Sequence, residues 1–355
     1  FAHPPTRAPQ RQRRGEGQCV GRIADEAQRE VQRQRKHRHE GQRPPSGGRR
    51  GVVRIVAIGH RRSMASSRAF PAVKPSVPRP PLLVFGLSGQ LGDALRCRGL
   101  PMPALAPSRQ PLPDEPGITW QRDSLATFDD AHRFDAALSL GPLDAFAMAV
   151  AERRVRAGRI VAFGSTSVHV KSASPDAAER DVAARLAEAE AALVAACRAT
   201  GTPCFILRPT LVWGMGRDAT VSRVVAMVRR WPRLPLPLGA PGLRQPVHAL
   251  DLADAAAVAL AADPAHAGAF DLPGDERVAF GTMLRRSVAA GAPAGRPLRL
   301  PWPLFAAAGR VHPRLRGLAS RLADDLVFDD RPARAALAWA PRGFQPGPAD
   351  FAPPP

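Results

Sequence analysis

The stretch LLVFGLSGQLGDAL, from Leu82 to Leu95, decides the fold. Its first four residues are apolar, as in a buried parallel strand, and a helical pattern follows the glycines. The spacing of Gly86, Gly89 and Gly92 lets the turn approach a pyrophosphate at the N-terminus of that helix. The stretch therefore predicts the opening strand, turn and first helix of a dinucleotide-binding domain. A tight packing turn is the alternative interpretation of the glycines.

From Pro81 onward, short apolar runs alternate with helical stretches, which is the pattern of βαβ units around a parallel sheet. A long Ala-rich helix is expected to start with Ser174 as N-cap and Pro175 in the first turn, and to run to Ala199 before Gly201. The fold class is therefore α/β, a Rossmann-type doubly wound parallel sheet. Its strands are expected near 82–86, 103–107, 118–121, 135–139, 159–164 and 203–208.

The formal net charge of +20 is concentrated at one end of the chain. Residues 1–80 hold 19 of the 51 basic and 5 of the 31 acidic residues, so the rest of the chain is only mildly basic. This segment is rich in Arg, Gln, Pro and Gly, and disorder is its default state. One interpretation is a nucleic-acid-binding arm, although aromatic residues for base stacking are missing from 20–67.

A second interpretation is that residues 1–63 extend upstream of the native start, because Met64 precedes the domain by a short Pro-rich linker. We weight this reading above a nucleic-acid-binding role. Residues 52–60, VVRIVAIGH, are compatible with a short strand, but no glycine turn or amphipathic helix follows them. They are not expected to open the domain.

The four cysteines show no pairing or histidine spacing that indicates a disulfide framework or a zinc site. No apolar run is long enough for a membrane span, and the N-terminus lacks the apolar region of a secretory signal. We therefore expect a cytoplasmic protein with reduced thiols, no metal and no membrane partner. A nucleic-acid partner is not favoured.

The residue type about 20 positions beyond the first glycine distinguishes the two nicotinamide cofactors. An acidic residue there binds the ribose 2′-hydroxyl of NAD, whereas an arginine accommodates the 2′-phosphate of NADP. This chain has Ser108 and Arg109 at that place. Arg109 favours NADP, with NAD as the alternative; a solvated loop arginine is an equally good reading of the residue.

Several segments follow one another in the order found in a known family. VFGLSGQLG is similar to the glycine motif of the short-chain dehydrogenase/reductase superfamily, and Asp123 looks like its adenine-contacting aspartate. FGSTSVHVK, ILRPTLVWGMGRD, RQPVHALDLADAA and LAWAPRGF resemble successive elements of its extended branch, the NAD-dependent epimerase/dehydratase family. The resemblance extends over most of residues 82–345.

The resemblance implies a cofactor site and a catalytic serine or threonine after the fifth strand. Ser165 matches that serine, and Thr166 lies beside it. Arg185 adjoins the place of the family's lysine and is a candidate to bind the ribose. The residues expected to bind cofactor are Gly86, Ser88, Gly89, Gln90, Leu91, Gly92, Arg109, Asp123, Leu140, Gly141, Arg185 and Pro209.

The family's YxxxK pair is missing, because the chain contains no tyrosine and its three lysines lie elsewhere. When Glu190 is aligned with the family's glutamate, Val182 and Leu186 occupy the positions of the tyrosine and the lysine. With Ala189 and Leu193, these residues form one apolar helical face, so the catalytic face is expected to have become packing.

Any remaining acid–base chemistry needs another group near the fifth strand. His169 is the catalytic candidate because histidine can titrate near neutral pH, although a hydrogen-bonded structural histidine is the commoner case. Lys171 is a candidate that is better explained as an exposed loop charge. Arg185 cannot serve as a general acid, because arginine stays protonated.

On the substrate side, the resemblance assigns Arg244 to the diphosphate of a nucleotide sugar, for which a guanidinium is suited. An exposed arginine before a strand is the equally weighted alternative. Trp213 replaces a family tyrosine and is expected to pack near the nicotinamide end and bind substrate. His248 and Asp251 are expected to hold a loop and a helix start.

The expected organisation is a basic Pro/Arg-rich segment and linker (1–80), an NAD(P)-binding Rossmann domain (81–210), remaining Rossmann elements with a small C-terminal substrate-binding cap (211–345), and a Pro-rich tail (346–355). The leading hypothesis is an atypical NAD(P)-binding epimerase/dehydratase-like or reductase-like protein for a nucleotide sugar or a small carbonyl compound. The alternative is a non-catalytic NADP(H)-binding sensor or scaffold. A homodimer is compatible with either.

Overall fold

A seven-stranded sheet forms the centre of the domain. The computed structural model describes residues 80–172, 174, 176–311 and 322–352, with side chains as far as 307 in the third range. Every strand pair in the sheet is parallel, and the spatial order is β13-β8-β7-β5-β1-β2-β3. The strands are β1 (Leu82–Phe85), β2 (Ala104–Ser108), β3 (Ile118–Arg122), β5 (Ala136–Ser139), β7 (Ile160–Phe163), β8 (Cys204–Pro209) and β13 (Gly268–Leu272).

The sequence-based fold prediction is confirmed. All six expected strands are present to within two residues at either end, and the sheet is doubly wound around β1. The seventh strand, β13, was not expected. The interpretations of residues 1–79, including the possible strand at 52–60, lie outside the described residues.

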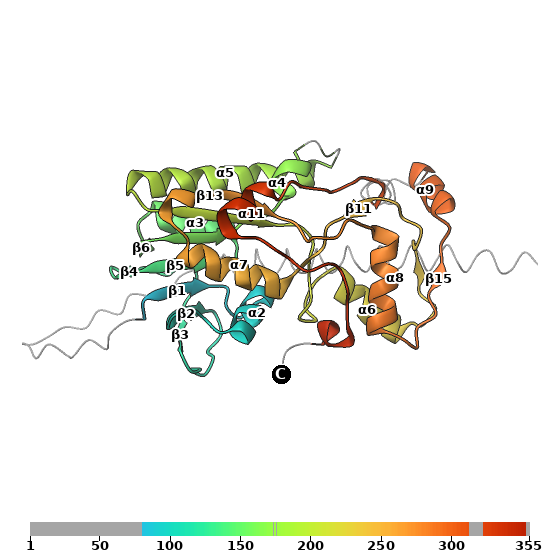
Figure 1. Cartoon of the computed structure of the whole chain (residues 1–355), viewed down its shortest axis with the longest axis horizontal. Coiled ribbons are helices and arrows are strands. Elements are labelled where there is room, and N and C mark those ends of the chain that lie inside the picture. Colours follow the sequence, from blue (N-terminus) through green and yellow to red (C-terminus); the bar gives the residue numbers. More distant parts are fainter. Residues whose placement is uncertain (1–79, 173, 175, 312–321, 353–355) are drawn as a thin grey trace, which may run out of the picture. The chain divides into compact units, whose positions relative to one another are not determined.

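Alternate residues of β1 face two different layers of helices, as a strand's two-residue period requires. Leu82 and Val84 belong to a core with α7 (Ala249–Ala261), against which α2 (Gln90–Arg98) packs. Leu83 and Phe85 belong to a second core with α3 (Leu143–Ala151) and α5 (Ala177–Ala199), which pack side by side. Figure 1 shows α3 and α5 in one layer and α2 with α7 in the other.

The long helix α5 begins later than predicted. Its N-cap is Asp176, whose side chain accepts a hydrogen bond from the Ala178 amide, so Ser174 is not the N-cap. Aspartate caps a helix as well as serine does, and it lies two residues nearer to the Ala-rich run. The helix ends at Ala199 as predicted, and Gly201 follows with φ of +63°.

Part of the remaining chain lies beyond the carboxyl edge of the sheet (Figure 1). Helices α6 (Val221–Arg230) and α8 (Phe280–Gly291) pack together there, and α9 (Trp302–Val311) follows. The short strand pairs are β9 (Val212–Trp213) with β12 (Val247–His248), β10 (Pro235–Leu236) with β15 (Leu298–Arg299), β11 (Leu243–Arg244) with β14 (Val278–Ala279), and β4 (Arg133–Phe134) with β6 (Arg156–Ala157). The other helices are α4 (Ser167–Val170), α11 (Arg331–Leu337), η1 (Pro264–His266) and η2 (Pro348–Phe351).

The segment expected to be a tail, 346–355, is described as far as residue 352 and is anchored to the domain by Asp350 and Phe351. Phe351 is buried against α8, and a Cβ on Gly291 would lie 2.6 Å from its ring. Asp350 contacts His248 at 3.2 Å, and its carbonyl accepts a hydrogen bond from Gly216. The C-terminal segment therefore connects α8 with the start of α7.

Candidate functional site

The glycine turn follows β1 and requires glycine at two of its three positions. Gly86 has φ of +82°, a conformation that side chains other than glycine rarely adopt. A Cβ on Gly92 would lie 1.8 Å from the carbonyl oxygen of Leu87, so the first turn of α2 passes directly over the loop. Gly89 is the N-cap of α2 and has no side chain to cover the helix N-terminus. The turn therefore presents backbone at the positive end of a helix.

The opposite wall of this turn comes from the end of β5. The Leu140 amide donates to the Phe85 carbonyl at 2.9 Å, and a Cβ on Gly86 would lie 3.2 Å from that of Leu140. Gly141 follows with φ of +114°. Because the strand order reverses between β1 and β5, this is the switch point where doubly wound sheets bind ligands. Gly86, Leu140 and Gly141 are thus brought together as the sequence interpretation requires.

A segment after β9 contacts the glycine turn. The Gln90 side chain donates to the Gly214 carbonyl at 2.9 Å. Arg217 donates to the Ser88 carbonyl at 3.1 Å and to the carboxylate of Asp93, which is 2% exposed, at 2.6 Å. Two of the residues predicted to bind cofactor are therefore engaged by this segment, and Arg217 is a site residue that sequence reasoning missed. Leu91 is half-buried.

Arg109 and Asp123 follow two neighbouring strands at the same edge of the sheet. The Asp123 amide donates to the Ser108 carbonyl at 2.9 Å, which connects the ends of β3 and β2. The Asp123 carboxylate accepts from the Ser124 amide at 2.7 Å and holds the turn that follows. Arg109 is exposed and makes no side-chain hydrogen bond to any other described residue. Its guanidinium is therefore available to an anionic ligand.

Ser165 and Thr166 lie directly after β7, but their hydroxyls already have partners. Thr166 is buried and donates from Oγ1 to the Pro209 carbonyl at 3.2 Å. Ser165 is half-buried, and its Oγ accepts from the amide of Ser167, the first residue of α4, at 3.2 Å. A serine oxygen that accepts one hydrogen bond can still donate one. Ser165 is the better placed of the two to contact a ligand.

His169 lies on α4 and belongs to a chain of charged side chains. Its Nε2 is 3.1 Å from Oδ1 of Asp271, on the unexpected strand β13. Asp271 is also 3.6 Å from the Arg208 guanidinium, and Arg208 forms a bidentate ion pair with Glu190 on α5. The Glu190 hydrogen bond raises the pKa of Arg208 against the opposing effect of burial. The network therefore runs from a buried carboxylate to an exposed imidazole.

Val182 and Leu186, where the sequence resemblance sets the family's tyrosine and lysine, face the packing layer only in part. Val182 and Leu186 are half-buried, whereas Ala189 and Leu193 are buried. The apolar face was therefore predicted in the right place, but its first two members retain exposure. Arg185 is exposed, and its Nε makes a long contact of 3.4 Å with the Asp181 carbonyl.

Arg244 is buried on β11, so its interpretation as an exposed arginine is wrong. Its guanidinium donates to the carbonyls of Leu243 at 2.7 Å and Asp324 at 2.6 Å, and it lies over the Phe280 ring. Burial lowers the pKa of Arg244, and the carboxylates of Asp324 and Asp325 oppose that effect. Contact with a substrate stays a prediction, because part of the guanidinium is engaged with the protein.

Trp213 is buried between the rings of His248 and Phe344, with ring centroids 4.5 and 4.7 Å away. Its Nε1 is buried without a hydrogen-bond partner among the described residues. The His248 Nδ1 accepts from the Leu250 amide and caps α7, while Asp251 pairs with Arg342 at 2.7 Å. The structural roles expected for His248 and Asp251 are therefore present.

Within the ranges that the structure describes, no cluster of three or more metal-ligating side chains occurs, and no helix is both long and apolar enough to cross a membrane. The partners that sequence reasoning missed, Arg217 and Asp271, each lie outside the glycine and serine motifs. Arg217 lies in the segment ILRPTLVWGMGRD, but no motif within that segment singles it out. Asp271 was hidden because its short strand was not recognised.

The chain matches no protein-family model, and a sequence comparison with curated proteins yields no match. Its fold is similar to that of solved nucleotide-sugar enzymes. UDP-glucuronic acid 4-epimerase from Bacillus cereus in complex with NAD is 12% identical, with a TM-score of 0.56 over 76% of this chain and 96% of that one. UDP-galactose 4-epimerase is 13% identical, with a TM-score of 0.58 over the same shares.

RMD from Pseudomonas aeruginosa complexed with NADPH is 13% identical, with a TM-score of 0.53 over 76% of this chain and 97% of that one. At these identities the likeness shows the fold. It extends over nearly the whole of each solved chain, including the elements beyond the sheet.

Proposed function

We propose that the chain binds a nicotinamide dinucleotide at the glycine turn. The observation that carries this proposal is the passage of α2 over Leu87, which leaves no room for a Cβ on Gly92 and places a bare helix N-terminus at the switch point. A diphosphate at that place is stabilised by the helix dipole and by unpaired amides. The similar fold of proteins solved with NAD and NADPH supports the same ligand.

The proposed cofactor is NADP, with NAD as the alternative. Arg109 follows β2 beside Asp123, exposed and without a side-chain partner among the described residues. A 2′-phosphate supplies the charge that a guanidinium binds best, whereas a 2′-hydroxyl supplies none. Bound there, the nicotinamide ring would supply hydride transfer, and the protein would orient it.

The proposed chemistry is epimerase/dehydratase-like or reductase-like, on a nucleotide sugar or a small carbonyl compound. Such a reaction needs a group that exchanges a proton with the substrate oxygen, and the chain has no tyrosine for this role. His169 takes that role in the proposal. When its Nε2–H donates to Asp271, its Nδ1 carries the lone pair that accepts the proton, and Asp271 holds the ring in that tautomer.

The binding of substrate is proposed to involve Ser165 and the Trp213 region. Ser165 retains a hydroxyl proton to donate to a carbonyl oxygen, and it lies four residues before His169. The Nε1 of Trp213, which has no hydrogen-bond partner in the described part of the chain, is one further donor next to Gly214, which contacts the glycine turn through Gln90. Arg244 is kept as a proposed diphosphate ligand, because a guanidinium suits that group.

A second function, a dinucleotide-binding sensor or scaffold without turnover, is favoured by a specific observation. Val182 and Leu186 stand where proton transfer and ribose binding occur in the family that the sequence resembles, and neither can do so. The two proposals share the cofactor and differ in turnover.

The enzyme and sensor proposals are distinguished by whether the protein turns over a substrate. The full chain is saturated with NADPH or NADH, and the oxidation of the reduced nicotinamide is followed by absorbance with a panel of nucleotide sugars and simple carbonyl compounds. Epimerisation with the oxidised cofactor is followed by chromatography of the sugar products. Reaction with any member supports the enzyme, whereas tight cofactor binding without reaction across both assays supports the sensor.

A further inference from the structure

A second cavity lies at the opposite edge of the sheet from the glycine turn. Ile160, the first residue of β7, forms part of its lining, whereas Gly86 follows the last residue of a parallel strand. The C-terminal ends of α3 and α5 flank this cavity through Val150 and Ala196. Because parallel strands start at one edge and end at the other, the cavity is separate from the proposed cofactor site.

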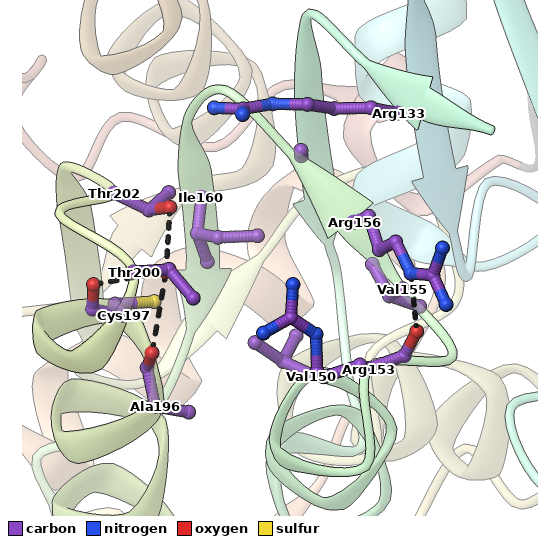
Figure 2. Close-up of a pocket in the computed structure, with 11 residues that line it drawn as sticks. Arg133, Val150, Arg153, Val155, Arg156, Ile160, Ala196, Cys197, Thr200 and Thr202 are labelled. Carbon is purple, nitrogen blue, oxygen red and sulfur yellow. Dashed lines mark hydrogen bonds between the residues drawn. The ribbon is translucent and has the colours of Figure 1, made fainter. Parts of the chain in front are cut away.

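Arginines line one side of this cavity and hydroxyls line the other. Figure 2 shows Arg133 and Arg153 extending into the space between the helix ends, with Thr200 and Thr202 across from them. No carboxylate is among the lining residues. Neither Arg133 nor Arg153 makes a side-chain hydrogen bond or ion pair with another described residue, in contrast to Arg154, which pairs with Glu152.

A third arginine, Arg156, also lines the cavity and supports this arrangement. The Arg156 guanidinium donates from Nε to the Arg153 carbonyl at 3.0 Å, as Figure 2 shows, and makes a longer contact with Ala131. It thereby holds Arg153, which has φ of +60°, a left-handed conformation that is strained for arginine. Such strain is maintained only where the surroundings impose it.

The charge in the cavity is not balanced by the helix ends. Each helix C-terminus carries about −0.5 of a charge, so the two together offset about one of the two unpaired guanidiniums. The last carbonyls of α5 are also occupied, because Thr200 Oγ1 donates to Cys197 at 3.1 Å and the Thr202 amide donates to it at 2.9 Å. The cavity therefore keeps a net positive charge.

The cavity is small and its floor is apolar. Its volume of about 100 Å³ lies well below the roughly 300–1,000 Å³ of sites for drug-sized ligands, which excludes a nucleotide sugar or dinucleotide. Val150, Val155, Ala157, Ile160 and Cys197 supply its apolar surface. The lining thus combines free guanidiniums with an apolar floor.

We propose that this cavity binds a small organic anion, whose carboxylate or phosphate group meets Arg133 and Arg153 and whose apolar body lies on Ile160. A guanidinium binds either group through paired hydrogen bonds, and burial of the apolar body against the floor adds affinity that an inorganic anion lacks. The site is independent of the proposed dinucleotide binding.

Butyrate is the probe, and Ile160 is the reporter. The sequence contains six isoleucines, so the full chain labelled at the isoleucine δ1 methyl gives few NMR signals, and Ile160→Val assigns the signal in the cavity. Butyrate is expected to shift the Ile160 signal saturably. The signals of Ile118 and Ile206, which lie outside the cavity lining, should not move and report that the fold is intact.

Butyramide has the same shape without the charge and should bind at least tenfold more weakly, since hydrogen bonds to charged groups are the stronger ones. Inorganic phosphate, which lacks the apolar body, should also bind more weakly than butyrate. Butyl phosphate is compared with butyrate to identify the preferred head group.

Glycine adopts the positive φ of residue 153 without strain, so Arg153→Gly removes one guanidinium and leaves the backbone conformation intact. Arg133→Gln removes the other guanidinium. Each should weaken butyrate binding about tenfold or more. The matched control is Arg198→Gln, which removes an exposed charge from the last turn of α5 outside the lining. Absence of a saturable shift, equal binding of butyramide, stronger binding of phosphate alone, or an equal loss in the Arg198 variant would overturn the proposal.

Discussion

At the scale of single residues, charge and availability distinguish the side chains of the proposed site. Arg109 is exposed and free of described partners, whereas Arg244 is buried and already donates to two carbonyls. The sequence predicts both as ligand-binding arginines, Arg109 from its position after the first glycine and Arg244 from the family resemblance, because residue type alone carries no information on partners. The structure therefore makes Arg109 the sharper test of the cofactor proposal.

Arg109→Ala should weaken NADPH about tenfold or more and leave NADH nearly unchanged, because only NADPH carries the 2′-phosphate. Isothermal titration calorimetry of the full chain with both cofactors measures the two affinities. The control is Arg122→Ala, an exposed arginine at the end of the neighbouring strand β3. Equal losses of NADPH and NADH affinity would contradict selection by Arg109.

His169→Gln should reduce any turnover by about 100-fold or more while the affinity for the cofactor is unchanged, because general acid–base catalysis contributes roughly that factor. Lys171→Gln is the control, since this residue is the other titratable group of the same turn. The kcat and the cofactor Kd of each variant provide the measurement. If Lys171→Gln lowered kcat as much as His169→Gln or more, the acid–base role would belong to Lys171 and the His169 proposal would be contradicted.

Asp271→Asn tests whether Asp271 positions His169. The variant keeps its shape but no longer offers a charged acceptor to Nε2, which is 3.1 Å away. The pH profile of kcat should move, whereas the cofactor Kd should not. An unchanged profile would assign Asp271 a purely structural contact with Arg208.

At the scale of elements, the first half of the domain is more predictable from sequence than the second. Strands β1, β2, β3, β5, β7 and β8 were located because each lies in a short, mainly apolar run bounded by turn residues. The start of α5 was misplaced because Ser174 and Asp176 are both good caps two residues apart, and sequence alone does not choose between them. Strand β13 was missed because Gly268–Leu272 begins with a glycine and contains Asp271, so it is not a continuous apolar run.

The element η2 shows how long-range contacts escape sequence reasoning. A Pro-rich composition predicts a tail, yet Phe351 is buried and Asp350 reaches His248, 102 residues away. Burial alone would raise the pKa of Asp350, but the hydrogen bonds from His248 and the Gly347 amide lower it below the ordinary value of 3.8. The carboxylate therefore stabilises the fold at neutral pH.

The stabilisation by Asp350 is present above the ordinary aspartate pKa of 3.8 and is lost as the pH falls through the lowered value. Asp350→Asn should cost about 1 kcal/mol at neutral pH, a fall in Tm of about 2–4 °C, and the difference from the native chain should vanish in acid. Thermal unfolding over a pH series measures it. Asp254→Asn, in an exposed ion pair with Arg98, is the control expected to change little.

At the scale of the whole molecule, the proposed dinucleotide site is assembled from segments that the sequence separates widely. The glycine turn, Gly141 and Gly214 belong to three different stretches, and parallel strand order brings the first two together. The fold and the proximity of the glycine turn to Gly141 could be predicted, because doubly wound sheets place their switch point at the carboxyl edge. The contact of Arg217 with Ser88 depends on side-chain geometry and could not.

The central claim is that the glycine turn binds a nicotinamide dinucleotide. It is tested most directly by calorimetric titration of the full chain with NADPH and NADH. The same titrations are made with two variants, Gly89→Asp and Gly89→Asn. Gly89 is the N-cap of α2, where both side chains are favoured, so the variants differ by one charge at the proposed diphosphate position. We predict saturable binding to the native chain, and at least tenfold weaker binding to the Asp variant than to the Asn variant. Absence of binding to the native chain, or equal affinities of the two variants, would contradict the claim.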